Sequence, residues 1–127
     1  MMRRSLNPDA VFTPQFYSHA VEVTAPQRLL YVSGQVGVRK GGAMADGMAE
    51  QAAVAVENMH AVLAEAGMTV ADVVKYTVYI TDEAQTGAFM QAAAGLIAEP
   101  PAAMTLVYVK GLARPGMLVE IEAVAAA

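Results

Sequence analysis

The chain contains no cysteine, only two histidines and few charged residues, and each of these shortages excludes a class of chemistry. Without cysteine, disulfide bonds and thiolate chemistry are both excluded. Two histidines alone cannot make a histidine-rich metal site. We therefore expect the chain to use no metal and no cofactor.

Charged residues make up only 16% of the 127 residues, whereas hydrophobic residues make up 56%. Soluble domains typically carry about 25% charged residues, and so apolar a composition excludes disorder as the main state. A domain of this length buries only about two thirds of the surface of its unfolded chain. Apolar surface should therefore remain, and another copy of the chain would cover it. We expect a single domain, residues 1–127, in a homo-oligomer.

Positive charge is also scarce, because the net charge is −4 and no run of basic residues occurs. Such a chain lacks the electrostatic footprint of a nucleic-acid-binding protein. The most apolar stretch, residues 88–98, contains Gln91 and Gly95 and is shorter than the roughly 20 residues that span a bilayer. Polar residues 7–9 follow the basic N-terminus, so no signal peptide is expected. We expect no nucleic-acid partner, no membrane partner and a cytoplasmic location.

Hydrophobic periodicity predicts the secondary structure. Apolar residues at helical spacing lie between Asp46, a potential N-cap, and Gly67, a potential C-terminal cap. A second helix is expected from Asp82 to about Ala98. Strands are expected at residues 19–24, 28–33, 73–80, 104–109 and 117–124, while residues 1–15 are expected to be irregular. The first two strands should form a hairpin, and residues 104–109, apolar on both faces, should form a central strand.

The predicted order ββαβαββ indicates an α+β fold, a two-layer sandwich with two helices on one face of a mixed sheet. The opposite face of the sheet then has no cover within the chain. This gives a second argument for a homo-oligomer, independent of composition.

Several segments resemble one protein family in a single register. They are residues 17–21 (YSHAV), 31–35 (YVSGQ), 51–67, 73–82 (VVKYTVYITD), 112–116 (LARPG) and 119–124 (VEIEAV). Together they resemble the Rid family, also called YjgF/YER057c/UK114 or "endoribonuclease L-PSP". The resemblance implies a chorismate-mutase-like homotrimer whose binding sites are clefts between subunits.

Well-known members of this family hydrolyse 2-imino and enamino acids to 2-keto acids and ammonia. The resemblance implies that Glu120 positions the attacking water, that Tyr17 lines the cleft, and that backbone groups around Gly34 bind the ligand. Backbone groups of the strand that follows the family's arginine, here Thr105 and Leu106, are expected to do the same. Glu122 points to the same face as Glu120. Without the resemblance, the sequence does not show which of the two glutamates positions the water.

The family's carboxylate-binding arginine is absent, because Met104 stands at its position, and we expect the Met104 side chain to lie at the mouth of the cleft as a substrate-binding residue. Methionine supplies neither the charge nor the fork of donors that binds a carboxylate. We therefore expect a trimer that binds a small molecule, a carboxylic or keto acid, without the standard imine deaminase activity. The alternative is a hydrolase that uses Glu120 and a different anchor, and an endoribonuclease ranks last. We do not expect Arg114 to bind the ligand in place of the missing arginine. Lys75 and Lys110 are interpreted as solvated charges.

Overall fold

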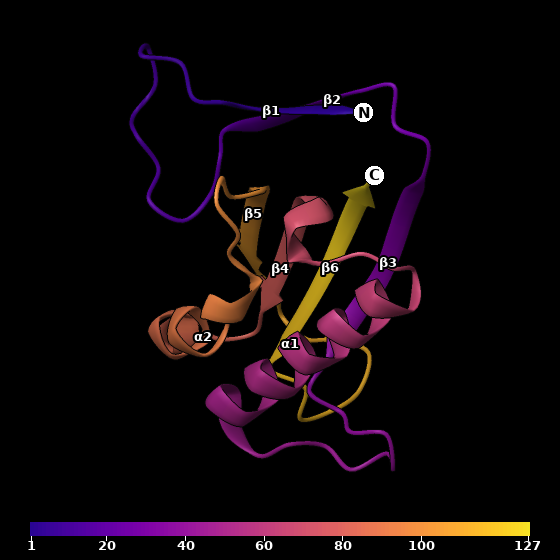
Figure 1. Cartoon of the computed structure of the whole chain (residues 1–127). Coiled ribbons are helices and arrows are strands. Elements are labelled where there is room, and N and C mark those ends of the chain that lie inside the picture. The colour runs from indigo at the N-terminus through magenta and orange to yellow at the C-terminus, as the bar shows by residue number, and fades with distance from the viewer.

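The computed structural model describes residues 1–127, which form six strands and two α-helices (Figure 1). The strands are β1 (Met2–Leu6), β2 (Ala20–Thr24), β3 (Leu29–Val36), β4 (Val73–Ile80), β5 (Ala103–Tyr108) and β6 (Val119–Ala126). The helices are α1 (Gly47–Glu65) and α2 (Thr86–Ala92). No helix has the length and apolar character that a membrane span requires.

Four strands form a mixed sheet in the order β3-β6-β4-β5, in which only β4 and β5 are parallel. Both helices lie on the same face of this sheet (Figure 1). Strand alternation directs every second side chain into that layer. On β4 and β6 the buried residues are Val73, Tyr76, Val78, Ile80, Val119, Ile121, Ala123 and Ala125, and Ala126 at the end of β6 is buried as well. The α+β class, the mixed sheet and the two helices on one face are as expected.

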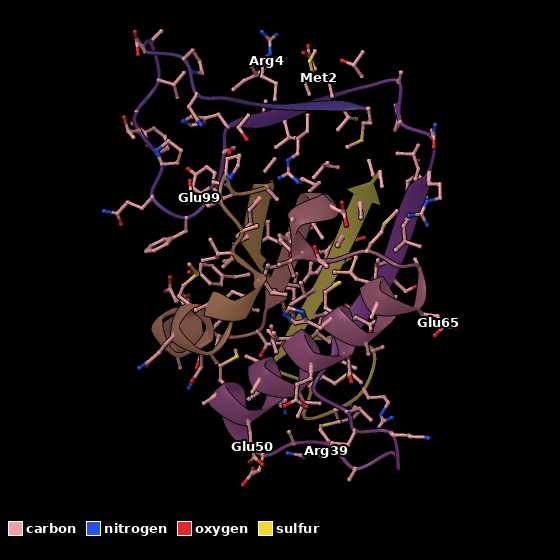
Figure 2. The ribbon with its side chains drawn as sticks, viewed as in Figure 1. Met2, Arg4, Arg39, Glu50, Glu65 and Glu99 are labelled. Atoms are coloured by element: carbon pink, nitrogen blue, oxygen red, sulfur yellow. The ribbon has the colours of Figure 1, made fainter.

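The uncovered face of the sheet carries the alternate residues. Lys75, Thr77 and Tyr79 of β4 lie on it beside Glu120 and Glu122 of β6, and all five are half-buried. Larger apolar residues of the sheet are exposed as well: the exposed fractions are 74% for Tyr31 and 37% for Val107. Charged side chains elsewhere lie at the periphery, as Figure 2 shows for Arg4, Glu50 and Glu65.

Two expectations about the N-terminal part are wrong. Residues 2–6 form β1 instead of an irregular segment, so the strand order begins with three strands instead of two. The expected hairpin is absent, because β2 pairs with β1 in a separate two-stranded sheet and β3 pairs with β6. A positive φ of 50° at Ala25 turns the chain between β2 and β3. Alternation therefore identified β2 and β3 but not β1, and it did not identify which strands are neighbours.

The expected central strand is an edge strand, because β5 pairs with β4 alone. Its apolar residues on one face pack toward α2, and those on the other face, such as Val107, lie on the uncovered face.

The expectation of one long second helix is also wrong. This segment is divided into a 3-10 turn at Glu83–Gln85, helix α2, and a 3-10 turn at Ala94–Leu96, because the chain leaves helical geometry at Ala93.

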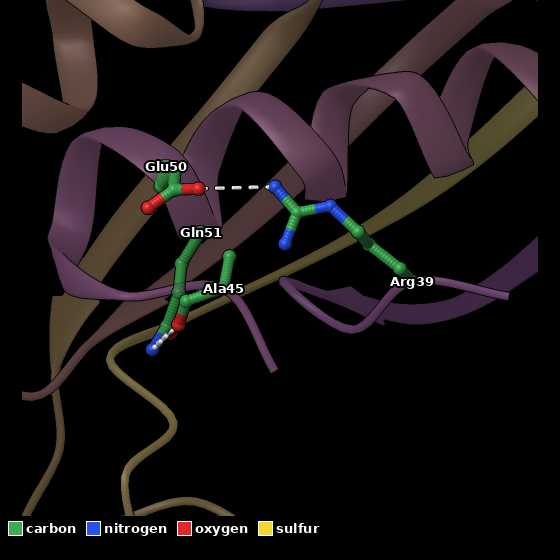
Figure 3. A network of polar contacts seen from close by, with 4 residues as sticks. All are labelled: Arg39, Ala45, Glu50 and Gln51. Carbon is green, nitrogen blue, oxygen red and sulfur yellow. Dashed lines mark hydrogen bonds and ion pairs between the residues drawn. The ribbon is translucent and has the colours of Figure 1, made fainter. Parts of the chain in front are cut away.

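The expected helix signals mostly hold. Gly67, with a φ of 71°, ends α1, and Thr69 and Asp72 form a reciprocal capping pair in the following 3-10 turn. Asp46 occupies the N-cap position of α1, but its side chain makes no capping hydrogen bond. The first turn of α1 is instead held from outside by Arg39, which pairs with Glu50 at 3.1 Å (Figure 3). Exposed pairs of this kind contribute only about 0–1 kcal/mol.

Gln51 is the main buried polar side chain of α1, with only 2% of its surface exposed. Its amide nitrogen donates to the carbonyl oxygens of Ala45, at 3.2 Å (Figure 3), and of Gly116, at 2.9 Å. Its amide oxygen accepts from the backbone N–H of Leu118 at 2.8 Å. One side chain thus ties α1 to the loop that joins β5 and β6.

Replacing this amide should destabilise the fold. Gln51→Leu leaves one buried N–H and two carbonyls without their partners, and we expect a loss of about 2–4 kcal/mol in the free energy of unfolding. Denaturant unfolding followed by circular dichroism measures it. The matched control is Gln91→Leu on the exposed side of α2, with an expected change of less than about 0.5 kcal/mol. Equal losses in both variants would contradict the role of the Gln51 amide.

Candidate functional site

The structure brings Gly34 and Glu120 together on the uncovered face. The register between β3 and β6 shifts between Val32 and Gln35, so that Val36 lies opposite Glu120. A Cβ atom placed on Gly34 would lie 2.2 Å from Oε1 of Glu120 and 2.6 Å from its Cγ. A larger residue at position 34 would displace this glutamate, because the side chain of Glu120 lies directly across the backbone of β3.

The two glutamates of β6 differ in their partners. Glu122 accepts a hydrogen bond from the hydroxyl of Tyr79, a residue of β4. Glu120 lies opposite Tyr79 in the register, but its carboxylate accepts no hydrogen bond and pairs with no cation. Of the two, Glu120 therefore has the carboxylate that is free to hold a water molecule or a ligand.

Lys75, which was expected to be a solvated charge, is a further candidate for the site. It is half-buried on the uncovered face, and its Nζ donates to Oγ1 of Thr105 at 2.7 Å. No carboxylate pairs with it. The available signal was parity: Lys75 is one residue from buried Tyr76 and four residues from Tyr79, so it shares a face with Tyr79 and Glu120.

The three predicted residues of β5 fall on two faces. Thr105 lies opposite Thr77, on the uncovered face. Met104 lies opposite buried Tyr76 and lines a small apolar cavity of about 10 Å³ beneath α2, together with Phe89. Leu106, two residues on, shares the face of Met104. Within one chain, the side chains of Met104 and Leu106 therefore point away from Glu120, and their predicted roles remain predictions.

Tyr17 lies in the loop before β2, where its neighbours hold it against the start of β5. The hydroxyl of Ser18 donates to the carbonyl of Pro101 at 2.6 Å, and the ring of Tyr17 meets that of His19 edge to face at 5.8 Å. Ser18 also bridges to Ala103, which lies opposite Lys75. Since Glu120 lies opposite Tyr79, four residues further along β4, about 13 Å of strand separates the two levels. The structure does not bring Tyr17 and Glu120 of one chain together.

The site has no cluster for a metal, since no group of three or more histidine, aspartate or glutamate side chains lies close enough to hold one. The guanidinium groups lie elsewhere. Arg4 pairs with Glu22, Arg39 pairs with Glu50, and Arg28 donates to the carbonyl of Ala66. Arg3 donates to the carbonyl of Ala71, and Arg114 lies in the loop between β5 and β6. No arginine therefore reaches Glu120 within the chain.

The family model described as "Endoribonuclease L-PSP" matches residues 8–127. A solved structure of the Rid-family protein YyfB from Yersinia pestis superposes with a TM-score of 0.87 at 35% sequence identity, and all of both chains is covered. The fold, the segments around Gly34 and Glu120, and these matches together define the class of protein. The chain belongs to the Rid (YjgF/UK114) family.

Two curated relatives match over part of their length. A RutC family protein from Aquifex aeolicus is 39% identical over 82 residues, which are 64% of this chain and 63% of that protein. The human 2-iminobutanoate/2-iminopropanoate deaminase is 41% identical over 68 residues, which are 52% of this chain and 47% of that protein. The matched segments therefore span less than two thirds of either relative.

The Tyr79–Glu122 hydrogen bond has a measurable electrostatic signature. The bond to the Glu122 carboxylate raises the pKa of Tyr79 above its ordinary value of 10.0. Above that pH, the unfolded chain loses this proton while the folded chain keeps it. The stabilisation from Tyr79 is therefore complete below about pH 10 and is lost as the pH rises through the folded-state pKa.

We expect Glu122→Gln to lower the pKa of Tyr79 toward its ordinary value. Titration of the tyrosinate absorbance measures the shift, and the variant Tyr79→Phe identifies which step of the titration belongs to Tyr79. Tyr31→Phe is the control, since Tyr31 makes no hydrogen bond to a carboxylate. An unchanged titration in Glu122→Gln would show that this carboxylate does not hold the phenol proton.

Proposed function

We propose that the chain forms a homotrimer that binds a small carboxylic or keto acid in clefts between subunits, without the standard imine deaminase activity. The observation that carries this proposal is the direction of Met104. At the position of the family's arginine, its side chain packs into the apolar layer beneath α2, and no guanidinium lies near Glu120. The cleft therefore keeps the free carboxylate and loses the carboxylate-binding fork.

The absence of the arginine fork should make the free energy of ligand binding substantially less favourable. Truncating one partner of a buried, hydrogen-bonded charge pair at an interface costs about 2–5 kcal/mol. At 1.4 kcal/mol for each factor of ten, even the lower figure weakens recognition of an imino acid more than tenfold. Backbone donors around Gly34 remain and support binding of a neutral or singly charged ligand.

The trimer is supported by two features. The face of the sheet opposite the helices has no cover, and it exposes Tyr31, Leu29 and Val107. Tyr17 and Glu120 of one chain also lie at different levels of the sheet. A cleft lined by both residues therefore requires two copies, Tyr17 from one and Glu120 from the next.

A second candidate function is a hydrolase of 2-imino acids. The free carboxylate of Glu120 supports it, together with Lys75, a cation of the uncovered face without an ion-pair partner. In this reaction Glu120 orients water to add to the carbon of the C=N bond. The adduct then releases ammonia and leaves the 2-keto acid. Lys75 of a neighbouring copy would bind the substrate carboxylate. Cleavage of RNA, which the description of the family model names, has the least support because the net charge is −4.

An activity assay separates the two candidates. An amino-acid oxidase generates 2-iminopropanoate, and the rate of 2-keto acid formation is measured with and without the protein. We expect no acceleration above the uncatalysed rate, because no fork binds the carboxylate. The human deaminase is the positive control. Acceleration that Glu120→Gln and Lys75→Gln both abolish would contradict our first proposal and support the hydrolase.

The trimer is tested by light scattering at micromolar concentration. We expect a mass of about 40 kDa, three times the 13.3 kDa of the chain. Tyr31→Glu places a charge on the uncovered face and should shift the mass toward that of the single chain, whereas the control Glu57→Gln on the exposed side of α1 should not. A wild-type mass near 13.3 kDa would refute the trimer.

A further inference from the structure

The loop that joins β5 and β6 borders a second hollow, of about 410 Å³, which is open to solvent. Sites for small molecules typically measure about 300–1,000 Å³. Its lining includes the polar residues Thr81, Lys110 and Arg114 and the apolar residues Leu112, Met117 and Leu118. Neither Met104 nor Thr105 lines it, and Gly34 and Glu120 do not line it either.

The rim of the hollow is held in place by bonds from three directions. Gln51 of α1 binds the carbonyl of Gly116 and the N–H of Leu118, at 2.9 and 2.8 Å. The N–H of Thr81 donates to the carbonyl of Leu118 at 3.1 Å, and the N–H of Met117 closes the turn onto the carbonyl of Arg114 at 3.3 Å. A rim fixed in this way loses little conformational freedom when a ligand binds.

The charge of the hollow is opposite to that of the chain. Lys110 and Arg114 are two of only eight lysines and arginines in a chain of net charge −4. Neither pairs with a carboxylate, since the ion pairs of the chain are Arg4–Glu22 and Arg39–Glu50. No aspartate or glutamate lines the hollow, and the hydroxyl of Thr81 makes no hydrogen bond within the chain. Two positively charged residues and a residue with an unpaired hydroxyl therefore line one space.

We propose that this hollow is a binding site for a small organic dianion, a dicarboxylate or a phosphate monoester. Arg114 offers a planar fork of donors to one anionic group, and Lys110 offers a point charge to the other or to the same group. The hydroxyl of Thr81 donates a further hydrogen bond. Leu112 and Met117 contact the carbon part of the ligand. The proposal does not depend on the cleft around Gly34 and Glu120.

Calorimetry with two dianions, succinate and phenyl phosphate, tests the proposal. It also shows whether the site prefers a dicarboxylate or a phosphate monoester. Acetate, a monoanion, is the comparison. We expect at least one dianion to bind about tenfold more tightly than acetate, because it meets both cations. Amide chemical shifts in NMR spectra should move at Thr81, Gly111 and Gly116 during the titration.

Single variants then identify the groups that bind. Arg114→Gln and Lys110→Gln should each weaken the dianion about tenfold, since each removes one charge-assisted contact. The matched control is Lys40→Gln, an exposed lysine outside the hollow, which should change the affinity less than about twofold because salt screens distant charges. A dianion bound in the hollow keeps its affinity in Glu120→Gln, whereas one bound in the cleft around Gly34 and Glu120 does not, so the two proposals fail separately. Affinity equal for acetate and both dianions, or unchanged in Arg114→Gln and Lys110→Gln, would overturn the site.

Discussion

The position of β6 between β3 and β4 determines both the core and the candidate site. On this strand Val119, Ile121 and Ala123 are buried under the helices, while Glu120 and Glu122 point to the uncovered face. Because the side-chain period of a strand is two, a slip of one residue would bury both carboxylates and expose the apolar residues. The burial of the core therefore fixes the register, and the register places Glu120 over Gly34. The stability of the fold and the geometry of the site have the same physical origin.

The sequence predicted those parts of the fold that depend on local patterns. Helical spacing identified α1, Gly67 its end, and alternation identified β2, β3, β4 and β6. The neighbours of the strands depend on contacts between distant segments, which no local pattern contains. For this reason β2 was assigned to β3 rather than to β1. The apolar residues on both faces of β5 indicated a central strand, although the strand lies at an edge.

The candidate site was likewise predicted in part. Gly34 and Glu120 were both identified from the family resemblance, and the structure adds the steric reason that joins them. The direction of Met104 was not identified, because the resemblance aligns positions and says nothing about the face to which a substituted side chain points. Met104 lies opposite the buried Tyr76, and this register shows that its side chain points toward the helices. Lys75 was missed because a lysine on a strand is most often a solvated charge. Parity with Tyr79 was the available signal, and the hydrogen bond to Thr105 agrees with it.

The contacts of Gln51 also bear on how the molecule fluctuates. The amide of Leu118 can exchange its hydrogen with solvent only after its bond to the Gln51 side chain breaks, and this same side chain holds the carbonyls of Ala45 and Gly116. The entry to α1 and the loop between β5 and β6 are more than sixty residues apart in the sequence. Because one side chain holds both segments, we expect them to open together, as one cooperative unit of local unfolding.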